Sequence, residues 1–515
     1  MMTILSLVPI LSLLVCLIVI KLSVVKAGAI SLVLALIIAL LQFGLGAFGL
    51  TVAVGKALSL ALFVSLIVWC ALFLYHLVDD FKAIDVINKN IVIFVEDKFV
   101  EFVLLAWLFT GLLQGMAGFG VPVVIVAPIL IALGFDKAKS LAAALLGHSW
   151  AVTFGSMGAA FFMINMVTGV PYEHLGMPMW IFNTIAHVLT GFGVCFIYDG
   201  MKGVKKGLAY VLPVSILMTI TQFITIYFEM YQLASINTAL VGLVAMFVLY
   251  KIRSRSAEKK KSGLYAADLN LAQAVTPYAS ILLISIIIQF LPQFLRNISL
   301  SFRFPGTETS LGYIVPPEEA YARIRLFGHP ALVLLIAALV AIIIYKRAGV
   351  WNKEVFRGSL KKTVKKGIPS TLALLCLGIM SLIMTDSGMM TRLASDVANL
   401  TGRMYSFVAP FFGVLASFLT GNNTNSNILF GYFQYTVAGS LGVSGAVMAS
   451  VQSISGAVGV SIGPTLVLMG ALATQQGGVE SKILRKLIPI VLIIALVMGI
   501  VNYILLEVMQ YGYMG

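Results

Sequence analysis

Seven consecutive Gly or polar residues, 420–426, interrupt an apolar region of this 515-residue sequence. They stand in "FLTGNNTNSNILFGYFQ", residues 418–434, between apolar flanks. Neutral amides and hydroxyls of this kind could hydrogen-bond a carboxylate and a hydroxyl, and their oxygens could ligate a sodium ion. An external loop without a site is the alternative. The candidate binding residues in this run are Asn422, Asn423, Thr424, Asn425 and Ser426.

A second interruption, "GLLQGMAGFGVPVVIVAP", covers residues 111–128. Gly115, Gly118 and Gly120 permit tight turning, and Pro122 suits the start of a returning helix. The tip would then present backbone N–H groups at a helix N-terminus, where an anion binds well. The alternative is a glycine-rich seam that packs helices together.

Three ionisable residues in or beside apolar segments are candidates for proton coupling, because such groups inside a membrane are usually functional. His148 lies in the apolar span 141–163 and has an ordinary pKa near 6.5, which suits a proton relay. His187 is either a second relay or a packing group. Asp386 could form an external gate or an ion pair with Arg392, or lie in a solvated loop.

Hydroxyl groups near His148 extend the candidate site. Ser149, Thr153 and Ser156 follow four- and three-residue steps, which predicts one helical face. Ser453 and Ser455 hold the equivalent place in the second half of the chain, and Gln114 precedes the first tip. The full set of expected substrate-binding residues is Gln114, Gly118, Phe119, Gly120, His148, Ser149, Asn422, Asn423, Thr424, Asn425, Ser426, Ser453 and Ser455.

The composition places these residues in a membrane protein. The chain is 60% hydrophobic and 10% charged, with a mean hydropathy of +1.04, whereas a soluble domain is about 25% charged. The net charge is +14, and the basic residues lie between apolar spans. They therefore indicate membrane topology rather than a surface for nucleic acid. The four cysteines form no metal-ligand pair, and no nucleophile triad appears. We therefore expect a lipid bilayer around the chain, no enzyme activity, no metal and no cofactor.

About twelve transmembrane helices are expected, together with the two interrupted regions 99–135 and 404–435. Counting crossings between basic, cytoplasmic loops makes each interrupted region enter and leave by one face, from opposite sides. The predicted fold is thus all-α, with two re-entrant hairpins. The expected spans are 4–20, 27–43, 55–78, 141–163, 178–198, 208–228, 233–252, 275–295, 329–346, 366–385, 444–470 and 485–507.

Two halves of the chain overlay without gaps on a shift of 306 residues, which places Gly115 on Gly421 and Asp80 on Asp386. Hairpins that enter from opposite faces are expected of an inverted repeat. We predict a first repeat over residues 1–207 and a second over 263–515. Residues 208–262 would supply connecting helices and a basic cytoplasmic loop.

The segments "GMAGFGVPVVIVAPILIALGF", "HSWAVTFGSMG" and "TGNNTNSNILFG" resemble the L-lactate permease family, which includes glycolate permeases, and the resemblance covers most of the chain. That family in turn resembles the wider ion-transporter superfamily of carboxylate carriers. The chain looks like a divergent member, with Asn422 and Asn423 where members often carry a "GSDT"-like run. The resemblance implies import of a small 2-hydroxymonocarboxylate, such as L-lactate, D-lactate or glycolate, coupled to protons.

The expected mechanism is secondary active transport by alternating access across a bacterial plasma membrane, with the two tips clasping one carboxylate. A co-transported proton is the expected driver, and sodium is the alternative. A sodium-coupled carrier of another organic anion and a passive anion channel are the competing functions. The chain could also form an oligomer.

Overall fold

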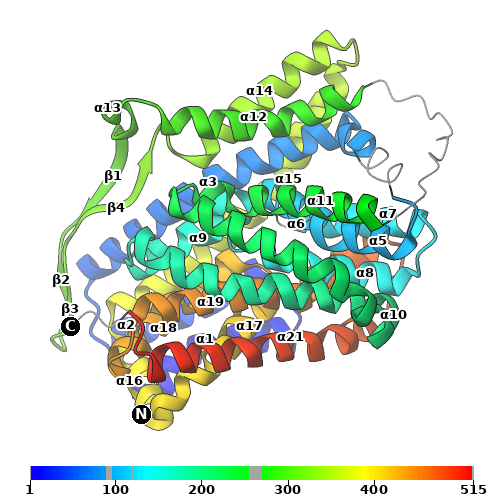
Figure 1. Cartoon of the computed structure of the whole chain (residues 1–515). Helices are drawn as coiled ribbons and strands as arrows, with labels where there is room; N and C mark the ends of the chain where they lie inside the picture. The colour runs from blue at the N-terminus through cyan, green and yellow to red at the C-terminus, as the bar shows by residue number, and fades with distance from the viewer. Residues whose placement is uncertain (1, 88–94, 119, 254–268, 513–515) are drawn as a thin grey trace.

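The computed structural model of the chain describes residues 2–87, 95–118, 120–253 and 269–512 (Figure 1). Phe119 and residues 254–262 of the predicted basic loop lie outside the described residues. The first half contains α1 (Met2–Ile18), α2 (Val24–Leu41), α3 (Ala47–Asp80), α5 (Lys98–Val103), the π-helical turn η1 (Leu104–Phe109), α6 (Thr110–Met116), α7 (Val121–Ala132), α8 (Lys137–Gly147), η2 (Ser149–Ala151), α9 (Gly155–Thr168) and α10 (Tyr172–Tyr227).

The second half adds a short stretch of strands to a further set of helices. In order these are η3 (Tyr231–Leu233), α11 (Ala234–Arg253), α12 (Leu271–Gln289), α13 (Gln293–Arg296), β1 (Ser299–Phe304), β2 (Thr307–Glu308), β3 (Ile314–Val315), β4 (Glu318–Arg325), α14 (Pro330–Arg347), α15 (Lys353–Asp386), α16 (Met389–Thr401), η4 (Gly402–Met404), α17 (Tyr405–Thr420), α18 (Asn423–Leu441), α19 (Gly445–Gly459), η5 (Val460–Ile462), α20 (Pro464–Ala473), α21 (Glu480–Tyr503) and η6 (Ile504–Val508).

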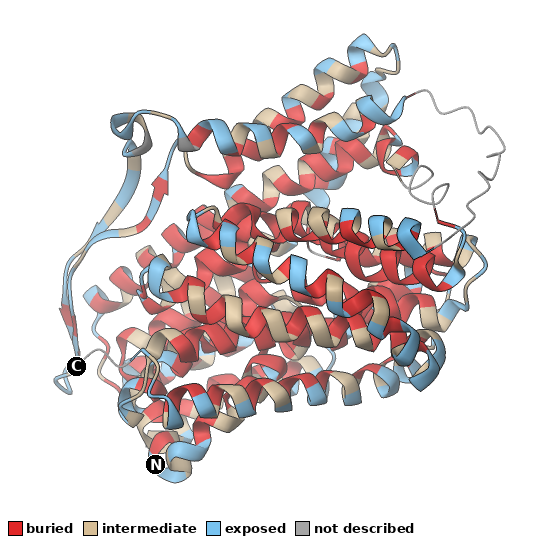
Figure 2. Cartoon of the chain, in the orientation of Figure 1, coloured by how far each residue is buried: buried red, intermediate tan, exposed pale blue. Residues whose placement is uncertain are grey.

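The expectation of a polytopic helical membrane protein is confirmed. Within the described residues, 11 helices are long and apolar enough to cross a membrane, or 12 if the bent pair α8–α9 is one span. The outward faces of peripheral helices are apolar and exposed, as Leu212, Ile216 and Ile220 of α10 illustrate at four-residue spacing (Figure 2). A stripe of this kind suits contact with lipid tails.

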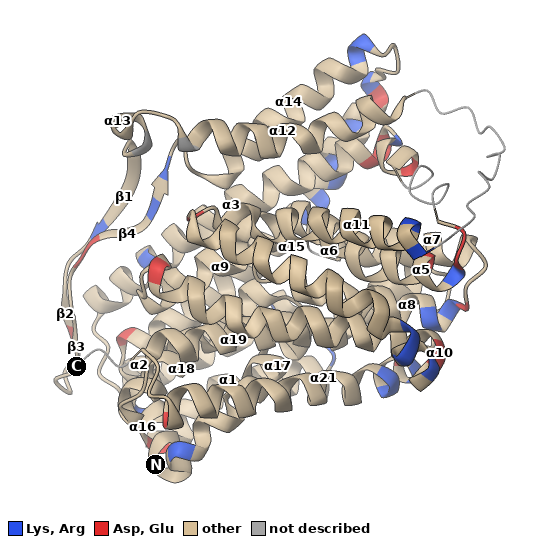
Figure 3. Cartoon of the chain, in the orientation of Figure 1, with Lys and Arg blue, Asp and Glu red and all other residues tan. Residues whose placement is uncertain are grey.

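Lys and Arg gather mainly at one end of the bundle, where the kink of α10 and the start of α21 lie (Figure 3). We call this the basic end, and the positive-inside rule predicts that it faces the cytoplasm.

Both interrupted regions fold as hairpins whose two arms return to the same end. In the first, Lys98 Nζ donates to the carbonyl of Leu133 over 3.2 Å, so the start of α5 lies beside the end of α7. In the second, the Tyr405 hydroxyl at the start of α17 donates to Gln434 Oε1, in the second half of α18, over 2.8 Å. The tips, at Ala117, Gly118 and Gly120 in the first hairpin and at residues 421–422 in the second, therefore lie at the far ends of the arms.

Equivalent helices recur at the shift seen in the sequence. α2 and α14 each have 18 residues and begin 306 residues apart, at Val24 and Pro330. α3 and α15 each have 34 residues and begin at Ala47 and Lys353, also 306 apart. The division into two repeats with a connecting segment stays a prediction, and this spacing supports it.

Helices α3 and α15 carry a matched pair of ion pairs. Lys56 of α3 lies 3.4 Å from Asp386 of α15, and both side chains are buried. Lys362 of α15 contacts Asp80 of α3. The two lysines and the two aspartates are each 306 residues apart, so one ion pair repeats the other at the opposite end of the helix pair.

The predicted continuous span 141–163 is wrong in detail, because the helix breaks after His148. Ser156, Met157 and Gly158 have positive φ angles of 48°, 56° and 83°. The expected shared face of Ser149, Thr153 and Ser156 is therefore also wrong, since that face assumes an unbroken 3.6-residue repeat.

Residues 296–328 contain two small antiparallel sheets, which the hydropathy pattern does not predict. β1 pairs with β4 and β2 pairs with β3, forming a ribbon at the end opposite the basic end (Figure 1). Near its tip, the N–H of Ser310 donates to the carbonyl of Gly44 over 3.0 Å, which fastens the ribbon to the α2–α3 turn.

Candidate functional site

A cavity of about 380 Å³ lies among the second hairpin tip, the α8–α9 break and α15. Its volume is at the lower end of the roughly 300–1,000 Å³ range of small-molecule sites. Both hairpins contribute residues to its wall. The predicted site residues that line it are Gln114, Gly120, His148, Asn422, Asn423, Thr424 and Asn425.

The second tip turns within two residues. Gly421 adopts a left-handed φ of 74°, which ends α17, and Asn422 is extended. The Asn422 side chain accepts a hydrogen bond from the N–H of Asn425 over 2.8 Å, so it caps the start of α18. The tip therefore directs the N-terminal turn of α18, with its partial positive charge, toward the cavity.

Asn423 joins the two halves of the molecule. Its Nδ2 donates to the carbonyl of Ser453 over 2.9 Å and to Thr153 Oγ1 over 3.1 Å. Because a carbonyl can only accept, this contact fixes the orientation of the Asn423 amide, with Oδ1 on the other side. Thr153 Oγ1 also donates to the Ser453 carbonyl over 3.0 Å. The second tip is thus held against the break between α8 and α9.

The first tip is held by the same break. The N–H of Gly118 donates to Ser156 Oγ over 2.8 Å, so this donor is already used, and Gly118 does not line the cavity. Gly120 does line it, and its φ of 85° is a left-handed conformation that favours glycine. Phe119, between them, lies outside the described residues.

His148 faces the cavity with a defined tautomer. Its Nδ1 lies 3.1 Å from the carbonyl of Ala144. Since a carbonyl needs a donor, Nδ1 carries the proton of the neutral ring and Nε2 is left as an acceptor. The ring can therefore accept a hydrogen bond or a proton from the cavity.

Four predicted hydroxyl residues support the wall from outside the cavity. Ser149 and Ser455 donate back to carbonyls of their own helix turns, Leu146 over 2.7 Å and Val451 over 2.6 Å. Ser426 Oγ accepts from Gln452 Nε2 over 3.2 Å. Ser453 Oγ accepts from Asn427 Nδ2 over 2.9 Å. Their binding role stays a prediction, and the structure places them behind the tip.

Two of the proton-coupling candidates lie away from the cavity. His187 is fully buried, and its Nε2 contacts Asn183 Nδ2 at 3.1 Å. Asp386 is paired with Lys56, and Arg392 instead pairs with Asp396, with Nε and Oδ2 2.9 Å apart. The suggested Asp386–Arg392 ion pair is therefore wrong. Of the three candidates, only His148 lines the cavity.

The sequence reading missed Lys366, which lines the cavity together with Ser370 and Ala373. In the sequence this lysine belongs to a basic segment between apolar spans, which indicates topology. However, α15 begins at Lys353, so Lys366 lies 13 residues into the helix, or about 20 Å along its axis. Ser370 and Ala373 follow Lys366 by four and seven residues, so helical spacing could have placed all three on one face.

The cavity carries positive formal charge. Among the described residues that line it, Lys365 and Lys366 are basic and none is acidic. In the described part of the chain, no group of three or more His, Cys, Asp or Glu side chains is arranged to hold a metal ion. The arrangement suits an organic anion bound by amides, a helix N-terminus and an ammonium group.

Comparison with known proteins identifies a family. The family model described as "L-lactate permease" matches residues 2–509. The glycolate permease GlcA of Escherichia coli K12 is 28% identical, with 96% of this chain and 94% of that protein aligned. The L-lactate permease of Bacillus subtilis is 25% identical over 93% and 91% of the two chains. The L-lactate permease of Salmonella typhimurium is 25% identical over 85% and 83%.

Among solved structures, the YdaH transporter of Alcanivorax borkumensis aligns with a TM-score of 0.48 and 12% identity, over 90% of this chain and 88% of that one. The whole-chain family match, the permease relatives and the many membrane-spanning helices identify a multi-pass protein of the bacterial plasma membrane. The chain belongs to the L-lactate permease family.

Proposed function

We propose that the chain transports a small 2-hydroxymonocarboxylate, either lactate or glycolate, by proton symport. The observation that carries this proposal is the cavity of about 380 Å³, where amides of the second hairpin tip meet His148 and two lysines of α15, with no acidic side chain among the described residues of the wall. The curated relatives are named for L-lactate and glycolate, and both compounds have one carboxylate and one hydroxyl on the adjacent carbon.

The polar groups divide naturally between the two parts of such a substrate. The first turn of α18 and the side chain of Asn425 offer donors to the carboxylate. His148 Nε2 offers an acceptor to the 2-hydroxyl when the ring is neutral. A proton that binds Nε2 would add positive charge beside the anion, which couples proton binding to anion binding.

Alternating access follows from the arrangement of the hairpins. Their tips meet at one cavity while their arms return to opposite ends of the bundle, if the repeats are inverted as predicted. Exposing the cavity to one side and then to the other would carry the anion and the proton together. We propose no enzymatic step and no resident cofactor, and the oligomeric state is left open.

One observation favours sodium coupling as the second candidate. Within the described residues, Asn423 Oδ1 and Ser417 Oγ are buried and have no hydrogen-bond partner. A Cβ built on Gly456 would lie 2.5 Å from that Asn423 oxygen, 3.0 Å from Ser426 Oγ and 3.2 Å from Ser417 Oγ. Three oxygens that face one point could ligate a cation. This cluster is the specific reason to test sodium.

Counterflow in proteoliposomes tests the function and separates the candidates. Vesicles preloaded with lactate, glycolate, pyruvate or a dicarboxylate are diluted into labelled lactate, with proton and sodium gradients imposed separately in parallel uptake assays. We expect counterflow with lactate and glycolate, and accumulation driven by an inward proton gradient. Accumulation that requires sodium would establish the second candidate. Downhill flux without accumulation under either gradient would indicate a passive channel and refute the proposal.

A further inference from the structure

The cavity needs a positive charge if it is to hold a carboxylate at membrane depth. An isolated carboxylate loses several kcal/mol or more when it leaves water, and neutral hydrogen bonds recover only part of that cost. The hairpin tips supply neutral groups, and the neutral form of His148 adds no charge. The remaining cations in the wall are on α15.

On α15, Lys366 belongs to the cavity face. Lys366, Pro369, Ser370 and Ala373 all line the cavity and follow the i, i+3, i+4, i+7 pattern of one helical face. Lys365 precedes this stripe, and its side chain is exposed, whereas that of Lys366 is half-buried. Lys366 and the amides of the second hairpin tip thus line the same cavity.

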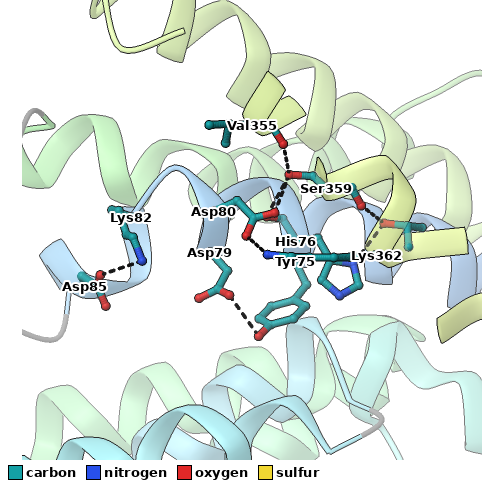
Figure 4. Close-up of polar contacts among 10 residues, drawn as sticks. Tyr75, His76, Asp79, Asp80, Lys82, Asp85, Val355, Ser359 and Lys362 are labelled. Carbon is teal, nitrogen blue, oxygen red and sulfur yellow. Dashed lines mark hydrogen bonds and ion pairs between the residues drawn. The ribbon is translucent and has the colours of Figure 1, made fainter. Parts of the chain in front are cut away.

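Lys366 has no competing partner among the described residues, in contrast to Lys362 one turn earlier. Figure 4 shows Lys362 contacting Asp80, which also accepts a hydrogen bond of 2.7 Å from Ser359. His76 Nδ1 lies 3.0 Å from Thr363 Oγ1 in the same cluster. These contacts hold the basic end of α15 against α3 and neutralise Lys362, while they leave Lys366 unpaired.

We propose that the ammonium group of Lys366 is the counter-charge that binds the carboxylate of the transported anion. This proposal rests on the transport function proposed above. The anion would then bridge two parts of the molecule, with Lys366 on a helix fastened to α3 and the amides on the second hairpin tip. A charge-assisted contact of this kind is about twice as strong as a neutral hydrogen bond.

A direct test compares lactate with lactamide, which has the same shape and no charge. We expect wild-type protein in detergent to bind lactate at least tenfold more tightly than lactamide, measured by thermal stabilisation across a titration. In Lys366→Gln this preference should fall to about threefold or less, chiefly through weaker lactate binding. Lys366→Arg should keep most of it, because the charge is retained.

Lys361→Gln is the matched control, since it removes the same charge from an exposed position of α15 outside the cavity. It should leave the lactate preference and the KM for counterflow within twofold of wild type. If Lys366→Gln also keeps both values within twofold, while wild-type protein transports lactate, the assignment of Lys366 is wrong and the transport function stands. If wild-type protein shows no lactate or glycolate counterflow, the proposed function itself fails.

A measurement on wild-type protein covers the case in which Lys366→Gln does not fold. Detergent-solubilised protein is acylated with acetic anhydride, and the modification of each lysine is followed by peptide mass spectrometry. Saturating lactate should slow acylation of Lys366 at least threefold and leave Lys361 unchanged, and lactamide at the same concentration should protect neither. Equal acylation of Lys366 with and without lactate would overturn the proposal.

Discussion

Replacing Asp386 by Asn should strongly destabilise the protein, because it leaves the ammonium of Lys56 buried without its partner. The two side chains are 2% and 4% exposed, and the charged atoms lie 3.4 Å apart. At that separation the attraction is about 5 kcal/mol for an effective dielectric constant of about 20. Removing one member of a buried ion pair typically costs about 3–5 kcal/mol. We therefore expect a loss of that order for Asp386→Asn.

The equivalent substitution at the other end of the helix pair provides the comparison. The Lys362 side chain is 57% exposed, so Asp80→Asn should cost about 1 kcal/mol or less from the ion pair. Thermal unfolding midpoints in one detergent rank the variants, and Lys56→Met with Asp386→Leu should recover most of the loss, since both charges are removed. An Asp80→Asn midpoint as low as that of Asp386→Asn, or a double variant less stable than Asp386→Asn, would refute this reasoning.

Three further outcomes follow from the structure. His148→Gln should keep lactate exchange but reduce proton-driven accumulation at least tenfold, measured as uptake under an imposed pH gradient; unchanged accumulation would exclude His148 as the proton site. Asn423→Ala should lower counterflow at least tenfold, because it loses its donors to Thr153 and Ser453, whereas Ser455→Ala, which only loses a bond within its own helix, should stay within twofold. Asp97→Ala should cost about 0.5–2 kcal/mol in unfolding free energy, since the Asp97 side chain caps α5. Burial raises the pKa of Asp97, but hydrogen bonds from Lys206 and from backbone N–H groups lower it by a larger amount. The pKa of Asp97 therefore lies below its ordinary value. Its stabilising contribution is therefore present at neutral pH and is lost as pH falls below about 4, and a larger Asp97→Ala effect at low pH than at pH 7 would contradict this.

The hairpins could be predicted because their cause is local. Gly118, Gly120 and Gly421 permit tight turns within apolar regions, and Asn422 is a residue type that caps the helix that follows. The number of membrane crossings between successive basic loops then predicts that both arms of each hairpin return to the same face. The same local reasoning made Asn422–Asn425 candidate binding residues, because polar groups at a helix start inside a membrane need hydrogen-bond partners.

What the sequence could not give depends on contacts between distant segments. An ionisable residue in an apolar stretch reads the same whether it lines a cavity, as His148 does, or pairs across helices, as Asp386 does with Lys56. Lys366 was overlooked because lysines near a helix end usually mark topology, and only the unusual length of α15 brings this one inward. Ser156, whose backbone is left-handed, accepts a hydrogen bond from the N–H of Gly118, 38 positions earlier, and no local pattern reports that contact.

The matched ion pairs of α3 and α15 have a consequence for how such a fold can arise. Each helix carries its lysine and its aspartate 24 positions apart, so each is electrostatically self-complementary toward an antiparallel copy. Two identical first halves, inserted in opposite orientations, would neutralise one another at both ends without any further substitution. The charge pattern of one such helix therefore specifies both ends of its contact with the other.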